Sequence, residues 1–259
     1  MLTELMVKKL VVGQLSTNCY LLFDKKSKEL LIVDPGDDAE FIMRIISDLG
    51  VKPTKIFATH GHFDHILAVS ELKLAYEAPR ALPVVSSQPA SQQSCLLTAR
   101  PAEQDSRKSF HPRVEPVDFC FADRIPFLMN KKDEFLLARM QESAKFFINL
   151  KADPPPKIDS YIEEMDELKI GNCKLKIIGT PGHTPGSTSL YYEKGDILLC
   201  GDLIFSEGIT GRTDFAYSSQ EDIEKSVEKI LNFPAATKVL TGHGEETTIK
   251  KLKLYNWYN

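Results

Sequence analysis

The feature that most restricts the fold of this chain is a run of three histidines and one aspartate, His60-Gly-His62-Phe-Asp64-His65. The chain has six histidines in 259 residues, so half of them lie in this run. Imidazole nitrogens and carboxylate oxygens are ligands that Zn²⁺ and similar divalent cations prefer. The run follows residues 55–59, which are typical of a buried strand that ends at a turn. We therefore expect a metal site on a loop at a strand end; a solvated polar loop is the alternative.

Three further candidate ligands lie in the same kind of place. His183 follows the apolar run 175–178, Asp202 follows 197–199, and His243 follows 238–240. Each stands beside a glycine, in the sequences Pro-Gly-His, Gly-Asp and Gly-His-Gly. Taken singly, a Gly-Asp pair is often a turn and a lone histidine is often structural. Because strand ends meet at one edge of a sheet sandwich, their repetition predicts one shared site.

The hydrophobic pattern predicts two similar halves separated near residues 154–156. The first half contains strands at 7–12, 19–23, 30–33 and 55–59, with helices at 39–49, 67–76 and 131–147. The second contains strands at 168–170, 175–178, 187–192, 197–200 and 238–240, with helices at 220–231 and 245–254. Groups of strands followed by helices in both halves favour an α/β chain folded as an αββα sandwich, in which helices flank two mixed β-sheets. The metals are expected at the edge between the halves.

Four motifs of this chain resemble those of the metallo-β-lactamase superfamily. They are the HxHxDH run, the loop of residues 180–187, which contains PGHTPGS, the Gly-Asp turn and the Gly-His-Gly turn. Two further pieces, Thr17-Asn-Cys-Tyr with Ile32-Val-Asp-Pro-Gly36, and Gly211-Arg-Thr-Asp214, are similar to its glyoxalase II branch. The resemblance covers the chain except residues 80–124. Two-domain glyoxalase II proteins carry a helical C-terminal domain that this sequence does not show.

The resemblance implies a ligand set and a reaction. His60, His62 and His183 would hold one divalent metal, Asp64, His65 and His243 a second, and Asp202 would bridge them. The metals are expected to be zinc, with iron or manganese as alternatives. Their shared water would ionise near neutral pH and attack a carbonyl, with Asp64 and Asp202 as the catalytic carboxylates. A thioester such as hydroxyacylglutathione is the expected substrate, because a thiolate leaves without a separate general acid.

Two supporting residues are also expected. Asp34, at the end of strand 30–33, is similar to an aspartate that supports a metal-bound histidine in the family; a turn residue is the alternative. Arg212 could clamp a substrate carboxylate through two hydrogen bonds. The alternative for Arg212 is a surface ion pair with Asp214, which would contribute little to stability.

Composition narrows the other possibilities. The net charge of −4 and the lack of a basic stripe argue against a nucleic-acid processing member of the superfamily. The N-terminus shows no signal peptide, no apolar run suggests a membrane span, and five widely spaced cysteines favour reduced thiols, so we expect a cytoplasmic enzyme. A persulfide dioxygenase with one iron, which shares several of these motifs, remains the alternative function. The oligomeric state is not predicted.

Residues 80–124 differ from the rest of the chain. They hold five of its eight arginines but one of its 24 lysines, and they include five prolines, six serines and no glycine. Their polar runs show no clear period. We interpret the segment as a flexible insertion within a single domain of residues 1–259, with a lid or a partner-binding loop as the alternative. His111 lies inside it and is not expected to be a ligand.

Overall fold

Short runs of leucine and β-branched residues form the strands of the first sheet. The computed structural model describes residues 5–77 and 124–255, and all structural statements below concern these residues. The first sheet has the order β1-β2-β3-β4-β5-β6. Its strands are β1 (Leu5–Val12), β2 (Thr17–Asp24), β3 (Glu29–Val33), β4 (Lys52–Phe57), β5 (Phe127–Asn130) and β6 (Ser160–Ile162). β1, β2 and β3 pair antiparallel, whereas β3 to β6 pair parallel, so this sheet is mixed.

The second sheet is also mixed and has the order β12-β11-β10-β9-β8-β7. Its strands are β7 (Glu167–Ile170), β8 (Cys173–Gly179), β9 (Thr188–Tyr192), β10 (Ile197–Gly201), β11 (Lys238–Thr241) and β12 (Thr247–Thr248). Only β10 and β11 pair parallel. Parallel neighbours matter here because the polypeptide leaves both strands at the same edge of the sheet.

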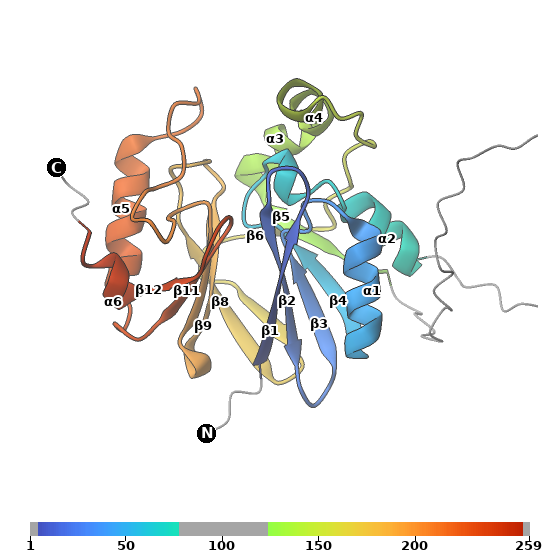
Figure 1. The fold of residues 1–259 in the computed structure, drawn as a ribbon, viewed down its shortest axis with the longest axis horizontal. Helices are drawn as coiled ribbons and strands as arrows, with labels where there is room; N and C mark the ends of the chain where they lie inside the picture. The colour runs from blue at the N-terminus through green and yellow to red at the C-terminus, as the bar shows by residue number, and fades with distance from the viewer. Residues whose placement is uncertain (1–4, 78–123, 256–259) are drawn as a thin grey trace, which may run out of the picture.

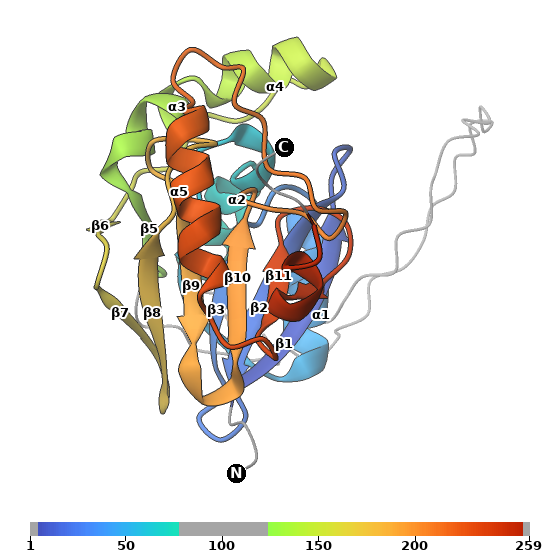
Figure 2. The same cartoon turned by 90° about the vertical axis from the view of Figure 1, so that its left-hand side faces the viewer.

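Helices cover the outer face of each sheet (Figures 1 and 2). The first sheet carries α1 (Ala39–Leu49) and α2 (Val69–Glu77), and the second carries α5 (Gln220–Leu231) and α6 (Ile249–Leu252). Between β5 and β6 the chain forms α3 (Glu134–Ala138) and α4 (Met140–Ile148). Three short 3₁₀ turns complete the elements of the described residues: η1 (Phe63–His65), η2 (Lys131–Asp133) and η3 (Glu193–Gly195).

Three buried apolar clusters hold these layers together, and strand β2 shows how they are built. Every residue of β2 is buried. Because successive side chains of a strand point to opposite faces, Cys19 and Leu21 pack toward α1 and α2, whereas Tyr20 and Leu22 pack against the second sheet. The third cluster lies between the second sheet and helices α5 and α6. The architecture is therefore the αββα sandwich predicted from the sequence.

Two predicted helices were wrong in their extent, and one strand was missed. The helix predicted over 131–147 is divided into η2, α3 and α4, because a tight turn carries the buried side chain of Asp133 into the interior. The helix predicted over 245–254 begins instead as strand β12, where Thr247 pairs with Val239 of β11. Strand β6 was not predicted, and it joins β5 in the first sheet. The first sheet thus extends beyond the break expected near residues 154–156.

Within the described ranges, no helix combines the length and the apolar character that crossing a membrane requires. The segment 80–124, interpreted as an insertion, lies outside the described residues except for Arg124, and His111 lies there with it.

Candidate metal centre

The seven candidate ligands lie together at one edge of the sandwich, on loops that follow four strands. His60 and His62 come after β4, and Asp64 and His65 belong to η1 directly behind them. The remaining candidate ligands, which follow β8, β10 and β11, are His183, Asp202 and His243. The predicted position at strand ends is therefore correct. Three overlapping groups have potential ligand atoms within 4.8 Å of one another: His60, His62 and His183; His60, His65 and Asp202; Asp64, His65 and His243.

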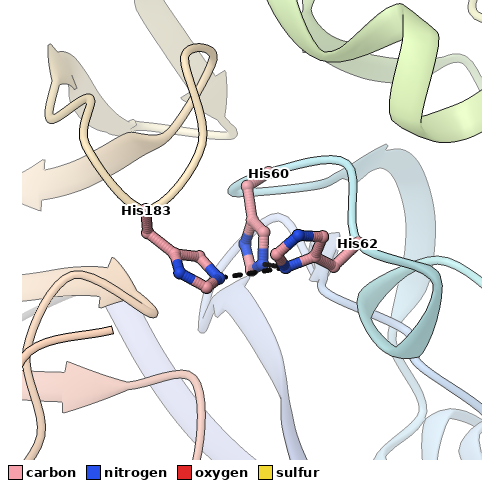
Figure 3. A group of neighbouring side chains, drawn as sticks. All are labelled: His60, His62 and His183. Carbon is pink, nitrogen blue, oxygen red and sulfur yellow. Dashed lines mark hydrogen bonds between the residues drawn. The ribbon is translucent and has the colours of Figure 1, made fainter. Parts of the chain in front are cut away.

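In the first group, three imidazole nitrogens face one point (Figure 3). His62 Nδ1 lies 3.1 Å from His60 Nε2 and 2.9 Å from His183 Nε2. Burial lowers the pKa of His62 to about 3 and also lowers the pKa of His60 well below its ordinary value. Both rings are therefore neutral at pH 7, which is the form that binds a metal.

In His183 and His60, the hydrogen bond made by Nδ1 determines that Nε2, which faces His62, carries the lone pair. His183 Nδ1 donates to the carbonyl oxygen of Arg212 at 2.9 Å, so its Nε2 is unprotonated when the ring is neutral. The same logic applies to His60, whose Nδ1 lies 3.1 Å from the hydroxyl of Thr59. That hydroxyl donates its own proton to Asp34 at 2.8 Å and so accepts from His60. Lone pairs directed at one another repel, and a cation between them removes the repulsion.

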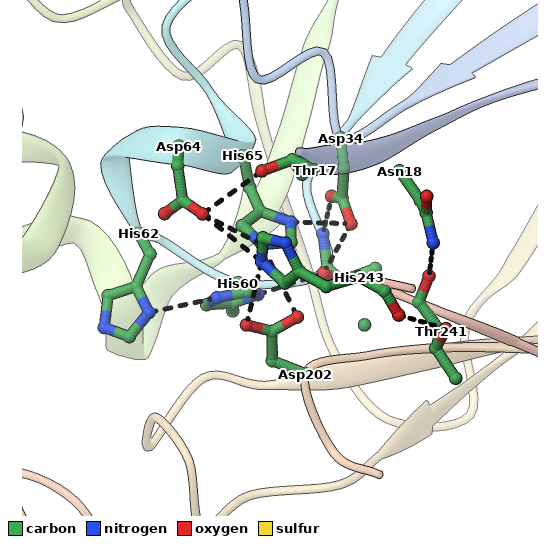
Figure 4. Close-up of polar contacts among 12 residues, drawn as sticks. Thr17, Asn18, Asp34, His60, His62, Asp64, His65, Asp202, Thr241 and His243 are labelled. Carbon is green, nitrogen blue, oxygen red and sulfur yellow. Dashed lines mark hydrogen bonds and ion pairs between the residues drawn. The ribbon is translucent and has the colours of Figure 1, made fainter. Parts of the chain in front are cut away.

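The group of Asp64, His65 and His243 shares no residue with the first and is called the second ligand group below (Figure 4). Asp64 Oδ2 lies 3.7 Å from His65 Nε2 and 3.4 Å from His243 Nε2. His243 donates its other ring nitrogen to the carbonyl of Leu15 at 3.1 Å, so its Nε2 is again directed inward. Burial opposes the charged form of His243, but hydrogen bonds to Asp202 and Asp64 raise its pKa to about 10.

Asp202 lies between the two groups. Its Oδ2 is 3.8 Å from His183 Nε2 and 3.5 Å from His243 Nε2, and its Oδ1 is 3.5 Å from His65 Nε2. Burial alone would raise the pKa of this carboxyl, but the charge on His65 and the hydrogen bond from His243 hold it well below its ordinary value. Asp202 Oδ1 and His65 Nε2 are buried and have no hydrogen-bond partner. Buried polar atoms without partners are costly, and two divalent cations would satisfy both.

Asp34 supports this centre from behind. Its carboxylate accepts hydrogen bonds from the backbone N–H of Thr59 at 2.7 Å and from the Thr59 hydroxyl, and it lies 3.1 Å from His65 Nδ1. The geometry fits the supporting role expected from the sequence. Asp34 is fully buried and adopts a left-handed backbone conformation, with φ of 52°, which is unusual for a residue other than glycine.

Arg212 lies at the edge of the cleft above the centre but is engaged with Asp214. The guanidinium donates two hydrogen bonds to that carboxylate, at 2.9 and 2.7 Å, and both side chains are about 60% exposed (61% and 64%). The ion pair that was the alternative for Arg212 is thus present. Its predicted contact with a substrate carboxylate stays a prediction.

The Thr17-Asn-Cys-Tyr motif anchors the loop that carries His243. The side-chain amide of Asn18 donates a hydrogen bond to the carbonyl oxygen of Thr241 at 2.9 Å, and its backbone N–H donates to the carbonyl oxygen of Gly242 at 2.7 Å. Thr17 donates its hydroxyl to Asp64 at 3.2 Å. The motif therefore links the first sheet to a ligand loop of the second.

Two residues near the ligands were not recognised from the sequence. The buried carboxylate of Asp133 accepts hydrogen bonds from Gly61 N at 2.9 Å, Gly186 N at 2.6 Å and the Thr184 hydroxyl at 2.6 Å. It therefore clamps the loop of His60 and His62 to the loop of His183. Tyr217 places its hydroxyl 2.8 Å from His62 Nε2. Neither carries a local motif; an aspartate among lysines looks like surface, and only the folded chain brings it between two glycines.

The thiol beside Asp202 is not part of the chemistry. Burial raises the pKa of Cys200 to about 12, so this side chain stays a protonated thiol at neutral pH. Its Sγ points to backbone carbonyls, among them that of Leu240.

A fold of this kind, with histidine and aspartate ligands for two cations at one edge, defines a class of metal-dependent hydrolases. The family model of the metallo-beta-lactamase superfamily matches residues 12–92 and 108–243. This chain therefore belongs to the metallo-β-lactamase superfamily, and it is a metal-dependent hydrolase by that membership.

Its relatives span nearly the same length. An uncharacterized protein of Aquifex aeolicus is 32% identical, over 97% of this chain and 96% of its own. The probable metallo-hydrolase YqgX of Bacillus subtilis is 31% identical, over 93% and 92%. The hydroxyacylglutathione hydrolase GloC of Haemophilus influenzae is 28% identical, over 92% and 91%.

Solved structures show the same fold. The BLEG-1 B3 metallo-beta-lactamase has a TM-score of 0.73 and 27% identity, covering 97% of this chain and 98% of that one. The protein TTHA1623, solved in a di-iron-bound form, has a TM-score of 0.70 and 24% identity, covering 95% and 96%.

Proposed function

We propose that this protein hydrolyses thioesters with two divalent metal ions held by the seven ligands. The observation that carries the proposal is the position of Asp202, whose carboxylate faces His183 of the first ligand group and both His65 and His243 of the second. Bound at the two groups, the ions would supply a hydroxide nucleophile at neutral pH and polarise the substrate carbonyl. Zinc suits this donor set, and iron or manganese is compatible with it.

The chain's own residues would have distinct roles. His60, His62 and His183 would hold one ion, and Asp64, His65 and His243 the other. Asp64 lines the cleft, and the charges of His65 and His243 outweigh burial and lower the pKa of its carboxyl. An ionised Asp64 is thus able to accept a proton from the attacking water. Asp34 would keep the ring of His65 in orientation through their 3.1 Å contact.

The leaving group is the reason for favouring a thioester. Outside the ligand set, the described side chains of the cleft that can donate a proton are Ser143, Tyr217 and Arg212. Burial raises the pKa of Tyr217 to about 12, and Arg212 is bound to Asp214. None of these is suited to general acid catalysis at neutral pH. A thiolate leaves without protonation, and the Haemophilus influenzae relative is named for a thioester substrate.

Metal content and a substrate panel test this function. Protein purified without chelator should contain close to two metal ions per chain and hydrolyse acyl thioesters, and chelation should abolish the turnover until metal is restored. His243→Ala should lose one metal ion. His111→Ala is the matched control, because His111 is the single histidine outside the ligand set.

Other results would assign another activity of the same fold. A single iron, with oxygen uptake on a persulfide and metal retention after His243→Ala, would identify a persulfide dioxygenase. Turnover of a β-lactam in place of thioesters would align the protein with the activity in the name of BLEG-1.

A further inference from the structure

The cleft above the metal centre has a polar floor and apolar walls. The floor consists of ligand side chains, among them His62, Asp64 and Asp202, which Figure 4 shows together. The walls come from four separate parts of the chain: Leu15 from the β1–β2 turn, Phe63 from η1, Phe147 from α4, and Phe215 with Tyr217 from the segment before α5. A scissile carbonyl on the floor would therefore have its substituents against apolar side chains.

The aromatic side chains of the walls are arranged in stacked pairs. The rings of Phe63 and Phe147 are 5.9 Å apart and 10° from parallel, and those of Phe215 and Tyr217 are 5.2 Å apart with the same angle. Tyr217 is held in turn by its hydrogen bond to His62. Stacking limits the motion of each ring, so the walls offer a formed surface rather than mobile side chains.

Parts of these walls remain open to water. Phe147 is 50% exposed and Leu15 is 43% exposed. A ligand in the cleft would cover these side chains, and removing apolar area from water is favourable. A ligand with apolar groups beside the reacting carbon would gain this free energy, whereas a strongly hydrated ligand would not.

The charged residues of the cleft also favour an apolar substrate. Arg212 is the single cationic side chain, other than histidine, among the described lining residues, and two hydrogen bonds tie it to Asp214. Its guanidinium also lies over the ring of Phe215, 4.6 Å from the centroid. A glutathione thioester carries two carboxylates, which require unpaired cationic or N–H donors when they enter a site. The walls supply apolar area in place of such donors.

We propose that the cleft selects thioesters with an apolar acyl group, alkyl or aryl, over hydroxyacylglutathione. The proposal rests on the function proposed above and departs from the substrate in the name of the GloC relative. In the reaction, water adds to the acyl carbon, the C–S bond breaks, and the products are a carboxylic acid and a thiol. No oxidant or reductant takes part.

Acyl thioesters of one small thiol, N-acetylcysteamine, test the preference for the acyl group. With the metal-loaded protein, kcat/KM should rise from acetyl through butanoyl to hexanoyl, by up to about fourfold for each methylene buried. Phenylacetyl should also exceed acetyl, and S-lactoylglutathione should be slower than hexanoyl. A flat or falling series, or S-lactoylglutathione as the fastest substrate, would overturn the inference while leaving thioester hydrolysis intact.

Variants locate the preference in the walls. Phe147→Ala and Leu15→Ala should reduce the increase in kcat/KM from acetyl to hexanoyl thioesters. Both side chains are partly exposed, so neither variant is expected to unfold. Leu74→Ala is the control, because Leu74 is 70% exposed on α2 and does not line the cleft. An unchanged chain-length dependence in both cleft variants would contradict the assignment.

Binding of non-hydrolysable analogues tests the walls without turnover. S-alkyl thioethers of N-acetylcysteamine should bind the metal-loaded protein more tightly as the alkyl group grows from ethyl to hexyl, measured by isothermal titration calorimetry. Phe147→Ala should weaken the hexyl compound more than the ethyl compound. Equal or absent binding along the series overturns the apolar site whatever the activity. Chain-length-dependent binding without hydrolysis of any thioester would instead retain the site and reject the proposed reaction.

Discussion

At the scale of single residues, Asp202 is the side chain whose loss we expect to affect activity most. It is the carboxylate that faces histidines of both ligand groups, and its buried Oδ1 has no hydrogen-bond partner. We expect Asp202→Ala to reduce turnover by more than about a hundredfold, beyond the 10–100-fold typical of residues that only support ligands. The six other ligands should still retain some metal, and the fold should persist in circular dichroism. Near-normal thioester turnover would disprove the bridging role.

Asp133 positions two ligand loops without touching a ligand. Its carboxylate accepts hydrogen bonds from two backbone N–H groups, those of Gly61 and Gly186, one on each oxygen. In Asp133→Asn the side-chain NH₂ group would face one of these N–H groups, and an unpaired buried donor costs about 1–3 kcal/mol. We therefore expect urea unfolding to show a free energy of unfolding lower by about 1–3 kcal/mol, and we expect weaker metal binding.

The neighbouring Glu134→Gln is the control for this prediction, because Glu134 is exposed. If Asp133→Asn and Glu134→Gln had equal effects on stability and on metal affinity, the hydrogen bonds of Asp133 to the two loops would not contribute to either.

At the scale of elements, helix α5 holds the loop of His183 in place. Ser219 caps this helix and donates its backbone N–H to the carbonyl of Gly182, at 2.8 Å. Gly182 has φ of 136°, and a Cβ on it would lie 2.3 Å from the backbone nitrogen of Ile223. Only glycine fits so close to the helix, and the Pro-Gly-His sequence thus reflects packing as well as chemistry.

Gly182→Ala should therefore displace the loop and with it His183. We expect a loss of about 2–4 kcal/mol in the free energy of unfolding, from steric overlap and the positive φ together. Gly50→Ala separates these causes, because Gly50 has φ of 60° but no atom within 4 Å of the added Cβ. Comparable losses in urea titrations of the two variants would show that the contact with α5 contributes nothing.

Asp24 connects the two sheets at a turn through a carboxylate that should be sensitive to acid. Burial would raise its pKa, but hydrogen bonds from the backbone N–H groups of Asn172 and Lys26, at 2.7 and 2.8 Å, lower it below the ordinary value of 3.8. A carboxyl group with a lowered pKa in the folded protein stabilises the fold above its unfolded pKa of about 3.9, and the contribution disappears as pH falls through the folded value.

We therefore expect the stability difference between wild type and Asp24→Asn to be largest near pH 7 and to shrink as pH falls below about 4. Urea unfolding at a series of pH values measures it. Asp48→Asn, at an exposed position of α1, is the control. If the stability difference between wild type and Asp24→Asn did not change with pH, the charge of the Asp24 carboxylate would not be its cause.

The same elements show which parts of the structure the sequence allowed us to predict. Strands such as β2 and β10 and helices such as α1 and α5 were predicted because their apolar residues recur with the period of the element. The positions of the candidate ligands were predicted because each of their loops follows such a strand. Strand β6 has one buried residue in three, so it leaves no pattern, and it forms because β5 lies beside it.

The missed parts of the site depend on contacts across long distances in the sequence. Asp133 meets Gly186 only after the first sheet has placed η2 beside the second. Tyr217 reaches His62 across 155 positions of the chain. Local periodicity contains no information about such pairs, and a lone aspartate or tyrosine is common at a surface. The four-part ligand motif was recognisable because each part repeats the same local context.

At the scale of the whole molecule, both sheets contribute loops to the candidate metal centre. Strands β4, β8, β10 and β11 supply the loops, so neither half alone contains a complete ligand set. Residues 80–124 contribute none of the seven ligands. Tyr76 and Ile125, near the two ends of that segment, belong to the same buried apolar cluster. The chain therefore leaves and rejoins the first half within one part of its core.

Deleting residues 80–124 and joining Pro79 to Ile125 should leave a folded protein that binds both metals. Lengthening a surface loop costs little, since each doubling adds only about 0.6 kcal/mol of closure entropy, and shortening it should cost equally little. Circular dichroism and elemental analysis measure the outcome, and limited proteolysis of the full chain should cut first within this segment. A deletion variant that folds and binds metal but loses turnover would make the segment a functional lid. A variant that fails to fold would show that these residues pack into the core, contrary to their composition.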